Sequence, residues 1–306
     1  MTFDLMRLIA ALLVVVSHTF PLSGAPALRI TGVEDLGALG VSIFFVISGY
    51  LVSASYQRDP KTYLIKRILR IEPGLIASLV VTVVALGFVT TAPAGVYWPK
   101  AAEYVARNAL LFPTTYELPG VFQAAPLAGV VNGVLWTLRL EFTFYVVLLL
   151  IRARLPLVLG LCVACAGVWL ALAFARPDWA DERATRIAFL GGRSGFLFFA
   201  GAALQLARVR VPLWAGAIAA VASAAPFVGP LALPAAVLGL ARPGKLPADL
   251  SYGVYIYAFP VQQVLASYGQ LNVATAVLAV LPFAAASWFL VERPALRLKP
   301  GPRPDW

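Results

Sequence analysis

Apolar stretches of membrane-spanning length follow one another along the 306-residue chain, and they constrain its fold more than any other feature. A hydrocarbon core ~30 Å thick is crossed by about 20 helical residues. Because strands of a membrane barrel would alternate apolar and polar residues, these continuous runs favour helices. We therefore expect an all-α, polytopic membrane helix bundle of about ten transmembrane helices. Our limits are residues 6–22, 36–54, 71–91, 134–151, 155–175, 188–207, 211–226, 228–242, 249–268 and 271–291.

The composition supports an integral membrane protein. The chain is 61% hydrophobic and only 12% charged, whereas soluble domains average ~25% charged residues. No polar stretch is long enough to form a separate soluble domain, so residues 1–306 are expected to form a single membrane domain. A net charge of +10 in a membrane protein mainly sets topology, and we expect no nucleic-acid partner.

The positive charges predict the orientation. With ten spans and both termini cytoplasmic, 16 of the 24 Lys and Arg residues fall on the cytoplasmic side and six outside, with Arg139 and Arg193 in or near the membrane. This asymmetry follows the positive-inside rule. The long outer segment 92–133 is rich in aromatic residues, which indicates either an interface belt or a sugar-binding surface.

Two sequence features have simpler interpretations than their patterns suggest. Residues 7–27 resemble a signal peptide, but cleavage would remove the only histidine, so we expect a retained helix. Cys162 and Cys165 form a C-x-x-C inside an apolar run with no nearby partner ligands. We expect small residues of a membrane helix there, and no metal site.

The first stretch carries ionisable residues on one helical face. Arg7 and His18 are eleven positions apart, which is three turns plus ~20° and roughly 16 Å of rise, and Asp4 lies one turn before Arg7. Charges in hydrocarbon cost ~2.5–3.5 kcal/mol, so such residues usually face a protein interior or a watery cavity. The alternative is a snorkelling arginine and a hydrogen-bonded histidine.

The next two stretches carry small and basic residues. Ser48 and Gly49, in GVSIFFVISGYL, allow either close helix packing or a groove for a thin ligand. Lys66, Arg67 and Arg70 follow at the expected cytoplasmic mouth. Because Arg67 and Arg70 are one turn apart, they could bind phosphates as a fork, beyond a role in topology.

The fourth stretch contains a candidate acid–base group. If Trp136 marks the interface, Glu141 lies ~8 Å below the outer surface and His18 at ~6 Å, so the two could share a proton. Tyr145 lies one turn after Glu141. The alternative is an ion pair of Glu141 with Arg139 or with Arg193, which opens the sixth span.

Seven segments together resemble the acyltransferase-3 family of bacterial membrane acyltransferases. They are Arg7 and His18 with ten residues between them, GVSIFFVISGYL, KRILRIEP, LWTLRLEFTFY, RSGFLFFAGA, LSYGVYIYAFP and VERPALRL, in order from residue 3 to 298. The resemblance implies transfer of an acyl group, often acetyl, from cytoplasmic acyl-CoA to a hydroxyl of an exported or lipid-linked glycan. It implies a multi-pass protein of the bacterial cytoplasmic (inner) membrane, with acyl-CoA as a co-substrate and no permanently bound cofactor.

The resemblance also implies roles for residues. His18 would be the catalytic base, with Glu141 in the active site. The CoA side would be held by Arg7, Arg67 and Arg70, and the segment from Trp136 to Glu141 would help form the active site. From the residues themselves we add Ser48 and Lys66 as candidates for binding CoA, and Trp136, Tyr145 and Arg193 as candidates for binding substrate. The pantetheine arm is expected to pass Ser48 and Gly49 and deliver the thioester near His18.

The chain departs from the family pattern in two respects, and two other functions are compatible with some of its features. Many relatives carry a histidine where this chain has Ala258, and some have an appended soluble esterase-like domain, so we expect the membrane part to complete transfer alone or with a partner. A flippase of lipid-linked sugars or a proton-coupled carrier would also use intramembrane His, Glu and Arg, but we find no repeat between residues 1–150 and 151–291. A structural assembly subunit would not explain ionisable residues in separate helices.

Overall fold

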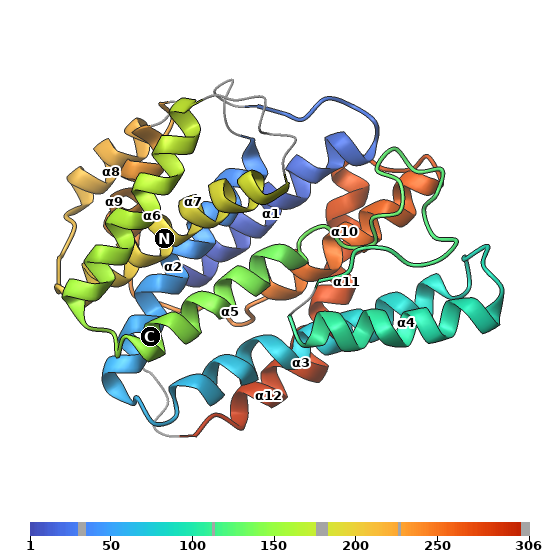
Figure 1. Cartoon of the computed structure of the whole chain (residues 1–306), viewed down its shortest axis with the longest axis horizontal. Helices are drawn as coiled ribbons and strands as arrows, with labels where there is room; N and C mark the ends of the chain where they lie inside the picture. The colour runs from blue at the N-terminus through green and yellow to red at the C-terminus, as the bar shows by residue number, and fades with distance from the viewer. Residues whose placement is uncertain (30–34, 112–113, 176–182, 226–227, 301–306) are drawn as a thin grey trace.

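The structure is a computed structural model that describes the chain apart from residues 30–34, 112–113, 176–182, 226–227 and 301–306. Its described residues form helices and connecting segments (Figure 1). The helices are α1 (Phe3–Leu22), α2 (Leu36–Arg58), α3 (Tyr63–Leu86), α4 (Ala94–Ala109), α5 (Leu135–Leu150), α6 (Leu155–Ala175), α7 (Arg183–Leu206), α8 (Leu213–Ala222), α9 (Val228–Leu240), α10 (Ser251–Ser267) and α11 (Val273–Ser287), followed by a π-helical turn (Trp288–Glu292) and α12 (Arg293–Arg297).

The all-helical fold predicted from the apolar stretches is confirmed. Each of the ten predicted spans overlaps one of these helices. Among the residues that the structure describes, six helical segments are long and apolar enough to cross a membrane, whereas α8 and α9 are shorter apolar helices. The total of ten spans and the cytoplasmic location of both termini remain predictions.

Helix α4 lies in the segment that we expected to be an outer loop. Its buried residues are Tyr97, Ala101, Tyr104 and Asn108, spaced three or four apart as on one face of a helix. In Figure 1, α4 runs beside α3, and the hydroxyl of Tyr97 donates to the carbonyl of Val83 at 2.6 Å. The helix was missed because its polar face keeps it below the hydropathy of a span.

Helix α3 begins at Tyr63, eight residues before the predicted start of the third span at residue 71. The prediction placed the boundary after the last basic residue, but the helix continues through them. The first two turns of α3 therefore carry Lys66, Arg67 and Arg70. The helix fixes the backbone of these residues more firmly than a loop would.

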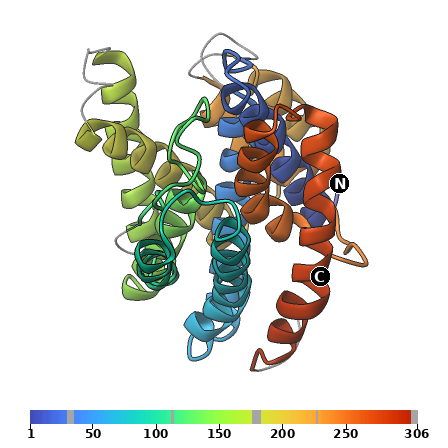
Figure 2. The same cartoon turned by 90° about the vertical axis from the view of Figure 1, so that its right-hand side faces the viewer.

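Close packing of α1, α2 and α7 explains two of the glycines. A Cβ atom on Gly49 would lie 1.9 Å from the carbonyl oxygen of Phe198 in α7, and one on Gly40 would lie 2.4 Å from that of Ala10 in α1. The small-residue interpretation is therefore correct for Gly49, which packs against α7 and does not border a groove. Figure 2 shows α6 and the C-terminal helices on opposite sides of this centre.

Candidate active site

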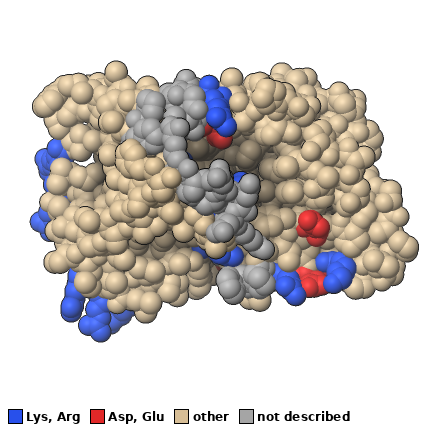
Figure 3. Space-filling model, turned by 45° about the horizontal axis from the view of Figure 1, so that its top comes forward, with Lys and Arg blue, Asp and Glu red and all other residues tan. Residues whose placement is uncertain are grey.

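A large cavity lies among α1, α2, α3, α5 and α10, with a volume of about 1490 Å³. Its lining is strongly basic, with eleven Lys and Arg residues against four Asp and Glu residues. The basic residues are Arg7, Arg58, Lys66, Arg67, Arg70, Arg210, Arg242, Lys245, Arg293, Arg297 and Lys299; the acidic ones are Asp4, Asp59, Glu141 and Asp249. By contrast, most of the surface in Figure 3 is uncharged, as expected for a membrane protein.

Arg67 is a basic residue of this cavity that has no partner among the described residues. Within the described part of the chain it makes no hydrogen bond or ion pair, and its Nε atom is buried. Lys66 on the same helix is paired with Asp59 at 3.0 Å, and Arg7 lies 3.9 Å from Asp4. A partly buried guanidinium without a counter-charge is costly, so Arg67 is suited to an anionic ligand.

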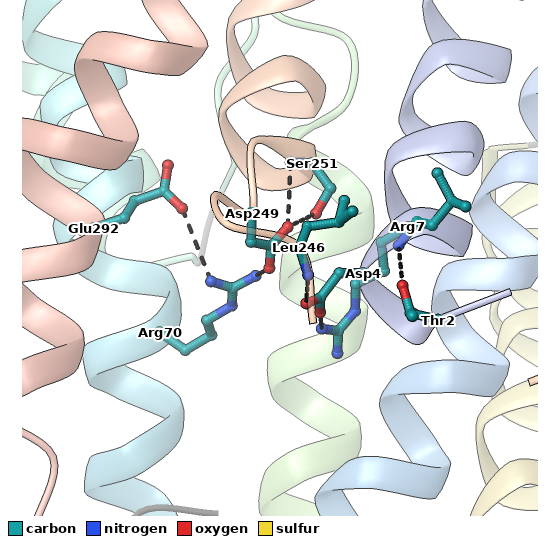
Figure 4. A network of polar contacts seen from close by, with 9 residues as sticks. Thr2, Asp4, Arg7, Arg70, Leu246, Asp249, Ser251 and Glu292 are labelled. Atoms are coloured by element: carbon teal, nitrogen blue, oxygen red, sulfur yellow. Dashed lines mark hydrogen bonds and ion pairs between the residues drawn. The ribbon is translucent and has the colours of Figure 1, made fainter. Parts of the chain in front are cut away.

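Arg70 is held by two carboxylates from the C-terminal part of the chain (Figure 4). It donates to Asp249 at 2.6 Å, and it lies 3.9 Å from Glu292 in the π-helical turn. Asp249 also accepts from the backbone N–H and the hydroxyl of Ser251. The expected fork of Arg67 and Arg70 thus consists of one unpaired guanidinium and one paired with protein carboxylates.

Lys299 adds a further basic group beyond the last membrane helix. Its burial, together with the positive charges of Arg67, Arg70 and Arg7, lowers the pKa of Lys299 to about 6. The described residues therefore crowd cations around this part of the cavity without enough carboxylates to balance them. Bound polyanion would relieve that repulsion.

Glu141, Ser48 and Tyr145 form a hydrogen-bonded cluster that lines the same cavity. Ser48 Oγ donates to Glu141 Oε1 at 2.6 Å, and the Tyr145 hydroxyl donates to the same oxygen. Ser48 Oγ and the Tyr145 hydroxyl are 2.8 Å apart. The carboxylate is thus bound by two hydroxyl groups.

Past this cluster, the lining changes from charged to largely apolar side chains. Phe44 and Tyr255 pack with ring centroids 5.3 Å apart, and the Tyr255 hydroxyl lies 2.6 Å from Thr137 Oγ1. Val41 and Leu138 complete this end of the cavity. Its chemistry suits an uncharged, flexible ligand segment better than a phosphate.

His18 lies outside the lining of this cavity. Its ring packs edge-on against Phe259 of α10 with centroids 5.2 Å apart, and its Nδ1 atom is buried without a hydrogen-bond partner among the described residues. The nearby carboxylate is that of Asp35, which caps α2 and accepts from Ser17 at 3.2 Å.

The predicted common depth of His18 and Glu141 is wrong. Ser17, next to His18, contacts Asp35 at the start of α2, whereas Glu141 contacts Ser48. Thirteen residues of α2 separate these contacts, a rise of about 20 Å. The prediction placed each residue from the end of its own helix, with Trp136 as the interface marker for α5, and so did not include the register of α5 against α2.

Two other predicted substrate residues also lie away from the cavity lining. Trp136 is half-buried in the first turn of α5, and Arg193 is half-buried within α7. Ala258 is buried in α10, so the side chain that this helix presents to His18 is the neighbouring Phe259.

Sequence reasoning missed Gln262 and most of the basic lining. Gln262 is fully buried in α10 and donates to Val15 O at 2.7 Å and Thr19 Oγ1 at 2.9 Å, on either side of His18 in sequence. Its Oε1 atom has no partner among the described residues. A glutamine inside an apolar stretch was the available signal. The C-terminal Arg and Lys residues were read only as topology signals.

This arrangement defines a multi-pass, all-helical membrane protein with a basic cavity among its helices and a histidine outside the lining of that cavity. Residues 2–243 match the acyltransferase domain of the acyltransferase-3 family, and the chain belongs to that family. The protein is an acyltransferase. No comparison favours the transporter alternative.

Two curated relatives cover nearly the whole chain. An O-acetyl transferase of Shigella phage Sf6 is 30% identical over 95% of this chain and 94% of the relative. Nodulation protein 10 of Rhizobium leguminosarum bv. viciae is 32% identical over 97% of this chain and 93% of the relative. No solved structure matches the chain.

Proposed function

We propose that this protein is an O-acyltransferase of the bacterial inner membrane. It moves an acyl group, most simply acetyl, from cytoplasmic acyl-CoA to a hydroxyl of an exported or lipid-linked glycan. Membership of the family and the similarity to a protein named O-acetyl transferase support the reaction class. The donor and the acceptor are argued below from the two parts of the site.

The observation that carries the proposal is the unpaired Arg67 within a cavity lined by eleven basic residues. Coenzyme A is a polyanion, and guanidinium groups bind phosphate in a bidentate manner. We place its phosphates against Arg67, with Arg7, Lys66 and Lys299 nearby. Arg70 would contribute by exchanging its contact with Asp249 for a phosphate.

The uncharged arm of the donor fits the remainder of the cavity. Beyond the basic residues, the lining consists of the Ser48, Glu141 and Tyr145 cluster and then of Phe44 and Tyr255. We assign the pantetheine arm and thioester to this end. The three-residue cluster supplies hydroxyl and carboxylate groups that can orient the thioester without carrying excess positive charge.

His18 would act on the acceptor. Its Nδ1 atom and the Oε1 atom of Gln262 in the adjoining helix have no partner among the described residues, which leaves hydrogen-bonding capacity for a sugar hydroxyl. The imidazole takes the hydroxyl proton, the oxygen attacks the thioester carbon, and the C–S bond breaks to release the thiolate, which is then protonated. General-base catalysis of this kind contributes typically 10²–10⁴-fold.

The donor and acceptor must meet for this step. Tyr255, at the end of the cavity lining, and Phe259, against His18, are four residues apart on α10, which is about 6 Å of rise. Reorientation of these two aromatic rings would join the cavity to the histidine. Figure 1 shows α10 beside α1, where this connection would form.

Mass spectrometry of surface glycans tests the function directly. Host cells that contain the protein should carry acylated glycans, and cells without it or with His18→Ala should lack them. Purified protein in nanodiscs should acylate the same glycan from acetyl-CoA. Identical glycans from all strains would overturn the proposal.

A further inference from the structure

A second pocket lies where α4 meets the segment that precedes α5, with a volume of about 470 Å³. It is at the end of α3 opposite to Lys66, Arg67 and Arg70, because Thr90 and Thr91, just after α3, bond to Pro119 and Gly120. Its lining residues are Lys100, Glu103, Tyr104, Thr115, Tyr116, Glu117, Leu118, Pro119 and Gln123.

Hydrogen bonds fix the walls of this pocket. Asn108 of α4 donates to the carbonyl of Thr115 at 3.0 Å and accepts from its N–H at 3.1 Å. The Thr90 hydroxyl donates to Pro119 O at 2.7 Å, and Val131 N–H donates to Tyr116 O at 2.7 Å. The pocket is therefore pre-formed, as ligand sites usually are.

Tyr104 carries the argument for a ligand. It lines the pocket and is only 2% exposed, yet its hydroxyl has no hydrogen-bond partner among the described residues. Leaving such a group unpaired costs as much as a lost hydrogen bond, so native structures rarely tolerate it without a reason. Tyr97, two turns earlier on the same helix, is buried to the same degree and does have a partner, the carbonyl of Val83.

The remaining lining residues indicate the class of ligand. Two tyrosines, two carboxylates and an amide offer flat apolar surface together with acceptors and donors for hydroxyl groups. Glu103 is already paired with Lys100 and Arg107, at 2.9 and 2.8 Å, and the described residues contain no group of side chains suited to a metal ion. Neutral, hydroxyl-rich ligands fit this surface better than cations or phosphates.

We propose that this pocket binds a sugar unit of the acceptor glycan, at a subsite apart from His18. The assignment rests on the proposed function, and the position across the bundle from the basic donor cavity agrees with it. The Tyr104 hydroxyl hydrogen-bonds a sugar hydroxyl, while Glu117 and Gln123 bind at the rim. The subsite holds the polymer while another of its hydroxyls reaches the acylation site.

The test compares Tyr104→Phe with Tyr97→Phe in nanodiscs. Binding of an array of bacterial surface oligosaccharides and of acetyl-CoA is measured for each. Tyr104→Phe should weaken oligosaccharide binding roughly 3–10-fold and leave folding intact, because the Tyr104 hydroxyl has no bond to the described residues that could be lost. Tyr97→Phe should lower thermal stability and leave oligosaccharide binding unchanged. The exposed Glu117→Gln provides a second variant that should weaken binding without affecting the fold.

The measurements distinguish failure of the sugar subsite from failure of the proposed function. Unchanged oligosaccharide affinity in both Tyr104→Phe and Glu117→Gln, or no oligosaccharide bound by the wild type, would overturn the subsite. Failure of the wild type to bind acetyl-CoA would instead contradict the proposed function, because this pocket plays no part in donor binding.

Discussion

Ser48 of α2 donates a 2.6 Å hydrogen bond to Glu141 of α5, and this contact assigns Glu141 to the basic cavity. His18 of α1 lies instead near Asp35, which caps the start of α2. The ionisable groups therefore form two separate sites along α2. We interpret the first as the donor site and the second as the acceptor site.

Replacing Glu141 tests its place at the donor site. Glu141→Gln keeps the size of the side chain but makes it a poorer acceptor for the Ser48 and Tyr145 hydroxyls. We expect transfer from acetyl-CoA to fall at least ~10-fold, on the scale of ~1.5–3 kcal/mol for a hydrogen bond to a charged group. Ser48→Ala, which removes one of the two donors, should have a smaller effect. Equal turnover by Glu141→Gln and the wild type would contradict the assignment.

The elements that the sequence predicted well are those set by hydrophobicity over long windows. Apolar runs gave the position of each spanning helix, and Arg7, Ser48, Lys66, Arg67, Arg70, Glu141 and Tyr145 do line one cavity. These residues could be assigned to one cavity because polar residues that interrupt an apolar membrane helix usually face the protein interior or a watery cavity.

What the sequence did not predict depends on tertiary contacts. The partner of Arg70 is Asp249, 179 residues away, and no local pattern specifies such a pair. The depth of Glu141 relative to His18 depends on the register of α5 against α2. Helix α4 was not predicted because the search required the hydropathy of a membrane span, and α4 is an amphipathic helix with a polar face.

Removal of the histidine should separate catalysis from donor binding. His18→Asn should abolish glycan acylation while acetyl-CoA affinity stays at the wild-type value, because His18 does not line the donor cavity. Turnover in nanodiscs and calorimetric titration with acetyl-CoA provide the two readouts. Normal acylation by this variant would exclude His18 as the base.

Donor binding should depend on pH through Lys299. In the free protein the pKa of Lys299 is about 6. Binding of a polyanion raises this pKa, so above pH 6 Lys299 takes up a proton when the donor binds. Acetyl-CoA affinity should therefore fall between pH 7.5 and 9, by at most ~tenfold per pH unit. The donor phosphates, with a second pKa of ~6, are fully ionised in this range.

The control for this pH dependence is Lys299→Met. It removes the titrating group, so its acetyl-CoA affinity should be nearly constant between pH 7.5 and 9. The other groups near Lys299 are Arg7, Lys66, Arg67 and Arg70. Of these, the arginines stay charged in this range. A slope that persists in the variant would exclude Lys299 as its source.

The ion pair of Arg70 with Asp249 should stabilise the fold. Asp249→Asn leaves the guanidinium with only the longer contact to Glu292, and we expect the free energy of unfolding to fall by ~1.5–3 kcal/mol. The double variant Arg70→Met, Asp249→Leu should lose less than the sum of the single changes, because neither member of this pair is left without the other. Additive losses would show that the two residues act independently.

The affinity for acetyl-CoA of Arg67→Ala in nanodiscs tests the central claim most directly. Because Arg67 has no partner among the described residues, its removal should leave the fold intact and weaken donor binding roughly 10–100-fold. Arg154→Ala, a change at an exposed arginine outside the cavity, is the matched control and should bind as the wild type does. Equal acetyl-CoA affinity in Arg67→Ala, Arg154→Ala and the wild type would contradict the account.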